Sequence, residues 1–311
     1  MKIVIIPDVH GRTFWKEAVE RFPAERFIFL GDYLDPYYFD VIYHEITPES
    51  TIENFQEILS FKKANPDRVT LLLGNHDCGY LYGKDVCDYR CDDGNYALIQ
   101  GLFRENKDLF QIADEATLRG RHFVFVHAGI HIQWMDRHIK GWNPGNMVSL
   151  LNALNKEALE SGFPEGTSFA QALSEADTQR GGEFDTGSPI WADALTLNAE
   201  YQLSDLTQVV GHSALRYGGP FVTPNIIFAD CEKAHYLGPG GGLYTLDGKR
   251  HRNEDDAFHP TPSPYEEWHK FDIDRFGRPF CRSCGSHNIF IRAGIMASHW
   301  YCNDCNSDQI L

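Results

Sequence analysis

Five short apolar runs, each followed by a loop of glycine, aspartate, histidine or asparagine, constrain this chain more than any other feature. The runs are Lys2–Pro7, Arg26–Leu30, Arg68–Leu73, His122–Val126 and Gln208–Val210. Each has the length and apolar content of a buried strand. Helical spacing follows Thr13, and a second helix is predicted from Thr47, with Pro48 at its first position. The alternation of strands and helices predicts an α/β domain.

The loops after these runs contain residues that bind metals. They are Asp8-Val9-His10-Gly11, Gly31-Asp32-Tyr33-Leu34-Asp35, Gly74-Asn75-His76-Asp77, His127-Ala128-Gly129 and Gly211-His212-Ser213. Because open α/β sheets place their sites outside the carboxyl ends of strands, loops far apart in sequence can meet at one point. A single histidine or aspartate after a strand has ordinary explanations, such as a turn or a helix cap. Five such loops together predict a metal site, since oxygen and imidazole ligands suit Mn, Fe, Zn or similar divalent ions.

The motif series resembles that of the calcineurin-like metallophosphoesterase superfamily from Met1 to about Asp247. Its form is similar to the branch of phosphoprotein phosphatases and bacterial diadenosine tetraphosphatases. The fourth motif is His127-Ala128-Gly129, and Ala214 rather than a second histidine stands two positions after His212. The resemblance implies an α/β (α+β) fold, a four-layer sandwich of two β-sheets flanked by helices with the metals at the sheet edge.

The resemblance also implies a set of ligands for two divalent ions, which would be Mn, Fe, Zn or Ni. The ligands are Asp8, His10, Asp32, Asn75, His127 and His212. Asp8 and His10 would bind the first ion, Asp32 would bridge both, and the other three would complete the second site. Two ions that share a carboxylate lower the pKa of a bridging water and hold the phosphoryl oxygens for in-line attack.

Two further residues take catalytic roles by the same resemblance. His76 would protonate the leaving oxygen as the general acid. Asp35 would orient the His76 imidazole and raise its pKa, so that a proton-donating form exists near pH 7.

The sequence departs from the protein-phosphatase pattern at the second and third motifs. Protein phosphatases carry a phosphate-holding arginine directly after the last aspartate of the second motif, where this chain has Pro36 followed by the aromatic run Tyr37–Phe39. This run either stacks on a nucleobase beside the metals or packs under the insert between the fourth and fifth motifs. The third motif ends in Asp77, as in diadenosine tetraphosphatases. Arg12 and Arg216 are candidates for phosphate contacts, although a surface role fits either equally well.

A long insert, about residues 131–207, separates the fourth and fifth motifs. Helices are predicted at Asn146–Ala158 and Ser168–Ala176. The tract Pro189–Asp193 resembles a tryptophan-containing tract found before the last ligand in the same branch. The insert either supports packing or forms a cap that shapes the substrate pocket.

The C-terminal part predicts a small zinc-binding module. Residues 255–270 are rich in proline and acidic side chains and predict a linker, which separates a metallophosphoesterase domain at 1–254 from a zinc ribbon at 271–311. Cys281 and Cys284 form one CxxC pair and Cys302 and Cys305 the other. This spacing is typical of two knuckles that give four thiolates to one structural zinc. So short a segment has little core of its own, so the metal would supply much of its stability.

The net charge and the number of cysteines limit which cellular location and which partners we expect for this protein. The formal net charge is −16, which repels nucleic-acid phosphates at long range unless a local basic patch or bound cations reverse the field. No stretch has the ~18 consecutive apolar residues of a membrane span, and no targeting segment is visible. Eight cysteines without a disulfide framework favour a reducing, cytoplasmic location.

The leading hypothesis is a cytoplasmic, metal-dependent phosphatase that hydrolyses small or nucleotide-like phosphoesters. The alternatives are a nuclease or nucleic-acid end-processing phosphoesterase, a Ser/Thr protein phosphatase, and a non-catalytic metal-binding module. The ribbon is less acidic than the rest, so it would contact nucleic acid, a protein partner or the enzyme's own pocket. No membrane partner is expected.

Overall fold

The computed structural model describes residues 2–23, 25–84, 90–161, 168–199, 203, 205–215 and 219–251. It also describes shorter segments at 271–273, 279–281, 284–287, 289–293, 298–302, 304 and 308–310. Two compact units make up the chain: Met1–Ser213 with Gly219–Asn253, and Ala214–Gly218 with Glu254–Leu311. Among the described residues, no helix has the length and apolar character needed to cross a bilayer.

The first unit contains a six-stranded sheet in the order β11-β10-β1-β2-β3-β4. Its strands are β1 (Ile3–Ile6), β2 (Arg26–Phe29), β3 (Val69–Leu72), β4 (Phe110–Gln111), β10 (His235–Leu237) and β11 (Leu243–Thr245). Strands β1 to β4 are parallel, and β10 and β11 add antiparallel pairs. The loops after β1, β2 and β3 therefore leave the same edge of this sheet.

A second sheet has five strands in the order β5-β6-β7-β9-β8. They are β5 (Ala113–Leu118), β6 (Arg121–Val126), β7 (Leu206–Val210), β8 (Phe221–Val222) and β9 (Ile226–Phe228). Strands β6, β7 and β9 are parallel, whereas β5 and β8 are antiparallel to their neighbours. The loops after β6 and β7 thus leave a common edge of the second sheet.

The main core lies between the two sheets. Ile3 and Ile5, two residues apart on β1, share one face of the first sheet, and Phe123 and Phe125 do the same on β6. All four side chains are fully buried in one apolar cluster. Burying these side chains fixes the register of both sheets, because a slip of one residue would turn each of them to the opposite face.

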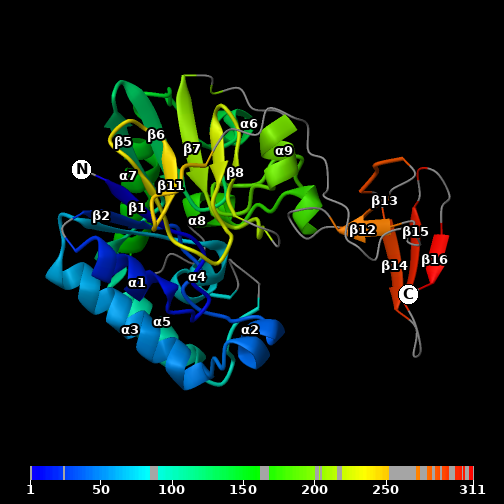
Figure 1. The fold of residues 1–311 in the computed structure, drawn as a ribbon, viewed down its shortest axis with the longest axis horizontal. Helices are drawn as coiled ribbons and strands as arrows, with labels where there is room; N and C mark the ends of the chain where they lie inside the picture. Colours follow the sequence, from blue (N-terminus) through cyan, green and yellow to red (C-terminus); the bar gives the residue numbers. More distant parts are fainter. Residues whose placement is uncertain are drawn as a thin grey trace. The chain divides into compact units, whose positions relative to one another are not determined.

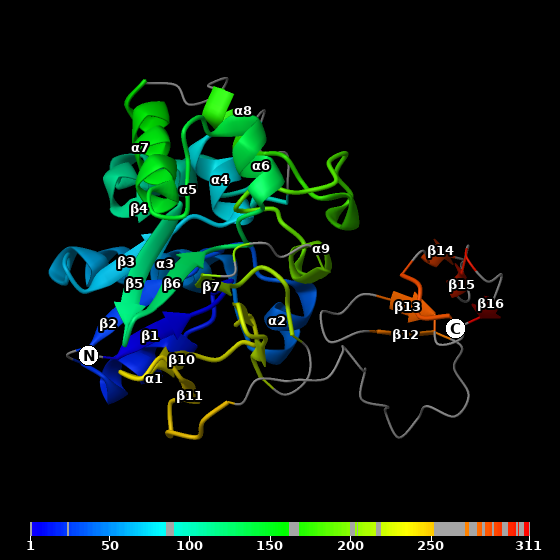
Figure 2. The same cartoon turned by 90° about the horizontal axis from the view of Figure 1, so that it is seen from above.

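Helices flank the two sheets. They are α1 (Phe14–Arg21), α2 (Tyr38–Tyr43), α3 (Pro48–Ala64), α4 (Asn75–Leu81), α5 (Tyr96–Glu105), α6 (Ile132–His138), α7 (Met147–Glu160), α8 (Ser168–Leu173) and α9 (Ala194–Ala199), with short 3₁₀ turns at Lys107–Leu109 and Thr178–Arg180. Helix α3 packs on β3 and lies beside α1, where Trp15 Nε1 donates to Asn54 Oδ1 at 3.0 Å (Figure 1). Helix α7 packs on β5, and Figure 2 shows it on the far side of the strands from α1. The predicted sandwich of two helix-flanked sheets is confirmed.

All five predicted strands are present, as β1, β2, β3, β6 and β7. The predicted cap at Thr47 is also present, since its Oγ1 accepts from the Ser50 N–H at 3.1 Å. Thr13 stands at the N-cap position of α1, but its side chain makes no capping hydrogen bond. Its ψ of 10° is not the extended conformation that such a bond needs.

The helix predicted to run to Ala176 ends at Leu173. The chain beyond it pairs with a later segment instead of continuing the helix. Ser188 N–H donates to Glu175 O at 2.8 Å, and Asp177 forms an isolated bridge with Phe184.

The second unit contains two small antiparallel sheets. They consist of β12 (Phe271–Ile273) with β13 (Pro279–Cys281), and of β14 (Ile289–Ala293), β15 (Ser298–Cys302) and β16 (Asp308–Ile310). Cys281 begins a tight turn: its carbonyl accepts from Gly285 N–H at 2.6 Å, and Gly285 has φ 74°. Cys305, the Cys302 side chain and the predicted linker at 255–270 lie outside the described residues.

Candidate active site

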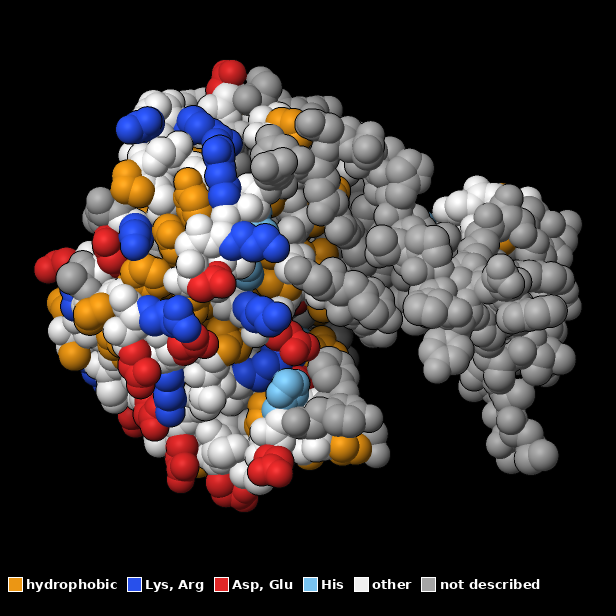
Figure 3. Space-filling model, in the orientation of Figure 1, with side chains coloured by type: hydrophobic (Ala, Val, Ile, Leu, Met, Phe, Trp, Pro, Cys, Tyr) orange, Lys and Arg blue, Asp and Glu red, His pale blue; other side chains and the backbone are white. Residues whose placement is uncertain are grey.

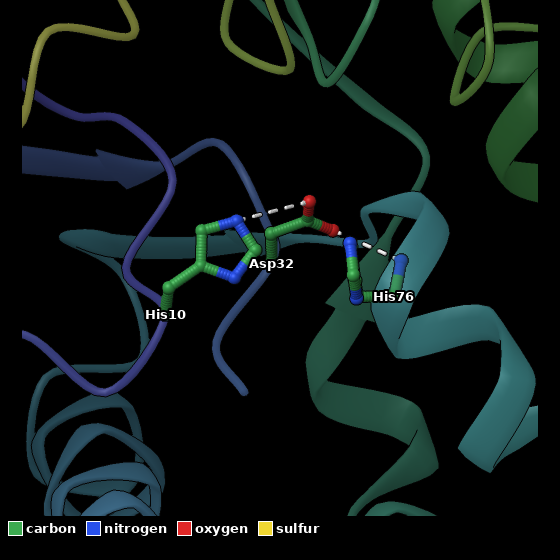
Figure 4. Close-up of side chains that lie close together, drawn as sticks. All are labelled: His10, Asp32 and His76. Carbon is green, nitrogen blue, oxygen red and sulfur yellow. Dashed lines mark hydrogen bonds and ion pairs between the residues drawn. The ribbon is translucent and has the colours of Figure 1, made fainter. Parts of the chain in front are cut away.

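Asp32 lies at the centre of the buried polar cluster where the five loops meet. Its Oδ1 accepts from the His76 backbone N–H at 3.0 Å (Figure 4). Its Oδ2 lies 3.6 Å from His10 Nε2 and also 3.6 Å from His127 Nε2. One carboxylate oxygen therefore faces two imidazoles that come from different sheets.

The hydrogen bonds of these two histidines fix which ring nitrogen carries the proton. His10 Nδ1 donates to Leu34 O at 2.7 Å, and His127 Nδ1 donates to Leu30 O at 2.8 Å. Because a carbonyl can only accept, each Nδ1 carries the hydrogen and each Nε2 presents a lone pair to Asp32. A backbone carbonyl that holds the distal nitrogen is the usual support for a metal-binding histidine.

Further ligand-type atoms surround His127 Nε2. Asn75 Oδ1 lies 2.9 Å from it and His212 Nδ1 lies 3.2 Å from it. His212 is partly buried, but its Nε2 is inaccessible to solvent, and no described residue hydrogen-bonds to that atom. A cluster so rich in lone pairs is electrostatically unfavourable alone and favourable around a cation, so these residues fit divalent metal ions.

Burial controls the protonation of the cluster. It lowers the pKa of His127 to about 3, and it lowers the pKa values of His10 and His212 well below that of a free imidazole. The neutral imidazole is the form that binds metals. Burial raises the pKa values of Asp8 and Asp32, and repulsion from nearby carboxylates adds to this effect.

Within this cluster, two groups of three side chains each bring their ligand atoms within 4.8 Å of one another, and Asp32 belongs to both. One group joins it to His10 and His76, and the other to His127 and His212. The resemblance assigned Asp8, not His76, to the first ion. The Asp8 carboxylate instead accepts from the His212 backbone N–H, at 3.0 Å and 3.1 Å from its two oxygens.

Asp77 organises the loops, a role that the sequence did not reveal. Its carboxylate accepts from the backbone N–H groups of Asp32 at 2.8 Å, Gly74 at 2.8 Å and Tyr33 at 3.1 Å. Gly74 is required by space, because a Cβ there would lie 2.1 Å from Asp32 Oδ1. Asp77 thus ties the third loop to the second at the point where Asp32 turns with φ 52°.

His76 and Asp35 form a buried pair beside Asp32. Asp35 Oδ2 lies 3.2 Å from His76 Nδ1, and Asp35 Oδ1 accepts from the Tyr80 hydroxyl at 2.5 Å. Burial raises the pKa of Asp35 to about 6. The expected rise in the His76 pKa is not found. Burial, aided by the charge of Arg90, lowers the pKa of His76 to about 3.

Tyr37 lies against the histidines rather than under the insert. Its ring centroid is 5.0 Å from that of His10 and 6.2 Å from that of His76, both edge-on. The guanidinium of Arg90 stacks 4.2 Å from the Tyr37 ring centroid. Arg90 also donates to the backbone carbonyls of Asp35 and Pro36. The side chains of the rest of the aromatic run lie outside the described residues.

Arg12 and Arg216 were proposed from the sequence to contact phosphate, and the structure describes only the first. Arg12 is buried, and its guanidinium bonds Asp40 through Nε at 2.8 Å and Nη2 at 3.2 Å. Its Nη1 donates to Asp8 O at 3.3 Å. The guanidinium nitrogens of Arg12 therefore already donate to groups of the protein. Arg216 lies outside the described residues.

The insert contributes directly to the wall of the site. Pro189 O accepts from Ala128 N–H at 2.8 Å, which fixes the loop after β6. The Trp191 ring meets the His212 ring edge-on, with centroids 5.8 Å apart. Arg180 donates to the Ser213 hydroxyl, directly after His212. Sequence analysis missed Arg180, whose only sequence signal is its place in the insert.

Side chains of both charges lie on the surface, although the net charge is −16. Figure 3 shows Lys and Arg side chains interspersed with Asp and Glu over the face in view.

Two helix-covered sheets with a carboxylate shared between histidine groups at their edge define the class of metallophosphoesterases. The family model described as calcineurin-like phosphoesterase matches residues 1–229, and the chain belongs to that family. The family comprises hydrolases of phosphoester bonds that use divalent metals.

Comparison with known proteins gives relatives of matching character. The chain is 32% identical over 195 residues to the serine/threonine-protein phosphatase 4 catalytic subunit of Eremothecium gossypii, covering 56% of each chain. It is 25% identical over 138 residues to the serine/threonine-protein phosphatase ppe1 of Schizosaccharomyces pombe, covering 41% of this chain and 39% of the relative. The chain thus spans about half or less of these relatives' length.

A solved structure is also similar. It is a protein serine/threonine phosphatase from Saccharomyces cerevisiae, 17% identical, with a TM-score of 0.45. The match covers 89% of this chain and 83% of that one.

Proposed function

We propose that this protein is a metal-dependent phosphatase that uses two divalent ions, Mn, Fe, Zn or Ni, to hydrolyse phosphoester bonds. The observation that carries the proposal is the position of Asp32 Oδ2, at 3.6 Å from both His10 Nε2 and His127 Nε2. Asp8 and His10 would hold one ion, and Asn75, His127 and His212 the other, with Asp32 shared. When bound, the ions supply Lewis-acid activation of water and neutralise phosphoryl charge.

The chain's own residues hold this arrangement rigid. Leu30 O and Leu34 O orient the two imidazoles, and Asp77 fixes the backbone at Asp32. Because the cluster is buried, few water molecules compete for the ligand atoms, and charges act strongly on one another.

His76 serves as the general acid and Asp35 as its orienting partner. With Nδ1 directed at Asp35, His76 Nε2 is the atom that passes a proton to the leaving oxygen. A phosphoryl dianion beside the imidazole raises the pKa of His76, because it stabilises the imidazolium. The donating form thus arises when substrate is bound.

Small or nucleotide-like phosphoesters are the proposed substrates. Tyr37 offers an aromatic surface next to His10 and His76, and the net charge of −16 opposes acidic phosphopeptides and long polyanions. The relatives' names support a second candidate, a Ser/Thr protein phosphatase. A nuclease would use the ribbon to contact nucleic acid. A non-catalytic module would not need His76 and Asp35.

For the C-terminal part we propose one structural zinc held by Cys281, Cys284, Cys302 and Cys305. The turn at Cys281 and Gly285 supports this, since a knuckle needs a tight turn between its two thiolates. We also propose the domain boundaries predicted above, contacts of the ribbon with nucleic acid or protein, and a cytoplasmic location.

The test is a screen of metal-stripped protein reloaded with Mn, Mg, Zn or Ni. Phosphomonoesters, phosphodiesters, dinucleoside polyphosphates and phosphopeptides are compared at fixed salt. Metal-dependent turnover, fastest on small or nucleotide esters, supports the proposal. Faster turnover of phosphopeptides favours the protein-phosphatase candidate, and turnover of diesters alone favours the nuclease. No turnover with any metal would favour the non-catalytic module.

A further inference from the structure

A metal-bound phosphoryl group needs positive charge around its outer oxygens, and three described arginines lie around the site. The position where protein phosphatases carry arginine is Pro36 here. Arg12 gives Nε and Nη2 to Asp40 and Nη1 to a backbone carbonyl. Arg90 gives one Nη to the Asp35 carbonyl and the other to Pro36. Neither guanidinium has its fork available for a ligand.

Arg180 differs from Arg12 and Arg90 because one of its guanidinium nitrogens is available to a ligand. Its Nε lies 2.8 Å from Asp193 Oδ2, an ion pair without hydrogen-bond geometry, and its Nη2 donates a hydrogen bond to Ser213 Oγ. Among the described residues none accepts from Nη1. The side chain is 22% exposed, so a ligand can reach it, whereas the Asp193 carboxylate is fully buried. The ion pair with Asp193 and the hydrogen bond to Ser213 together restrain the guanidinium.

The contact with Ser213 brings Arg180 beside the ligand cluster. His212 has φ 61°, and Ser213 N–H donates back to Gly211 O at 2.6 Å, so the chain turns sharply at His212. Arg180 is therefore held next to His212, a proposed metal ligand, by its hydrogen bond to the following residue, Ser213.

We propose that Arg180 binds a non-bridging oxygen of the substrate's phosphoryl group through Nη1, with Asp193 and Ser213 holding its guanidinium in place. This inference rests on the proposed phosphoester hydrolysis. The insert thereby supplies the fixed positive charge that the second motif lacks at Pro36. A guanidinium fork suits a phosphoryl group because its donors are planar and permanently charged.

The experiment compares Arg180→Ala, Arg180→Lys and a matched control, Arg137→Ala. Arg137 also bonds a carboxylate and a hydroxyl of the insert, at Glu175 and Thr186, but no contact links it to His212. Metal content and folding are checked first. Binding of inorganic phosphate to the metal-loaded proteins is then measured by calorimetry, together with kcat/KM for one phosphomonoester.

Arg180→Ala is expected to weaken phosphate binding about 10-fold or more, the worth of a charged hydrogen bond, and Arg137→Ala to leave it unchanged. Added guanidinium should restore part of kcat/KM in Arg180→Ala alone, which a structural role would not produce. Arg180→Lys should bind phosphate with an affinity between those of the wild type and Arg180→Ala. Unchanged phosphate affinity in folded, metal-loaded Arg180→Ala would overturn the inference.

If Arg180→Ala does not fold because the buried Asp193 carboxylate loses its cationic partner, the double variant Arg180→Ala with Asp193→Asn removes that buried charge. Weakened phosphate binding in it supports the inference, and wild-type binding contradicts it. An active wild type with an unaffected Arg180 variant refutes this inference alone. A wild type that is inactive on all phosphoesters, with every metal, refutes the proposed function and this inference with it.

Discussion

The carboxylate of Asp77 accepts a hydrogen bond from the backbone N–H of Asp32, 45 residues earlier in the chain, at 2.8 Å. The same carboxylate also accepts from Tyr33 and Gly74. The residue proposed to bridge the metals is thus positioned by a side chain that binds no metal itself.

Replacing Asp77 should therefore damage both stability and catalysis. Asp77→Ala leaves three buried N–H groups without acceptors, at about 1–3 kcal/mol each, so we expect a loss of at least ~3 kcal/mol in unfolding free energy. Asp77→Asn keeps one acceptor oxygen and should lose less. Urea denaturation measures both variants, and equal stability of Asp77→Ala and wild type would contradict this role.

His76 should matter most for poor leaving groups. A general acid contributes roughly 10²–10⁴-fold to rate, so His76→Gln should slow hydrolysis of alkyl phosphates by at least ~10²-fold. p-Nitrophenyl phosphate should lose far less, because nitrophenolate leaves without a proton. Asp35→Asn should likewise slow hydrolysis of alkyl phosphates more than hydrolysis of p-nitrophenyl phosphate. Kinetics on the two substrates checks this, and an equal loss on both would exclude His76 as the acid.

His235 predicts a pH dependence of stability. The imidazole is buried on β10, where burial lowers its pKa to about 4, whereas an unfolded histidine has a pKa of about 6.5. Between these values the unfolded state binds more protons, so this contribution is full above pH ~6.5 and is lost as pH falls towards 4. The slope is ~1.4 kcal/mol per pH unit.

The His235→Gln variant isolates this contribution from that of other buried groups. Its stability relative to wild type, from urea midpoints between pH 4 and 8, should improve as pH falls. A constant difference across this range would show that His235 does not titrate as described.

The C-terminal cysteines predict a separable metal. Elemental analysis should find about one tightly held zinc in addition to the catalytic ions. Cys281→Ser with Cys284→Ser should remove it, because two of four thiolates are lost, yet leave hydrolysis of p-nitrophenyl phosphate largely intact. Loss of that activity in the double variant would mean that the ribbon belongs to the active site.

Much of the fold was predictable because apolar runs and the residues after them are local in sequence. Strands β1, β2, β3, β6 and β7 each combine a buried run with a recognisable loop. Strand β5 was missed because its sequence, Ala113–Leu118, is half polar and its partner is needed to recognise it. The available signal was Gly120, which with Arg119 forms the turn after β5; both residues have positive φ.

The site was predictable only where its residues stand in the loops. Asp77 stood in a loop, but its acceptor role depends on N–H groups of a distant strand end. Arg180 and Trp191 lie in the insert, and nothing local indicates that they meet Ser213 and His212. The His76 pKa was mispredicted because the burial of the imidazole cannot be read from its neighbours in sequence.

The shared position of Asp32 is the central claim, and Asp32→Asn tests it most directly. This change removes the charge proposed to contact both ions while keeping the side chain's size. With folding verified, bound catalytic metal and turnover are measured together on the same preparation. We predict that the variant loses at least one of the two ions and that turnover falls ~10³-fold or more. Two bound ions with near wild-type turnover in folded Asp32→Asn protein would contradict the two-metal account.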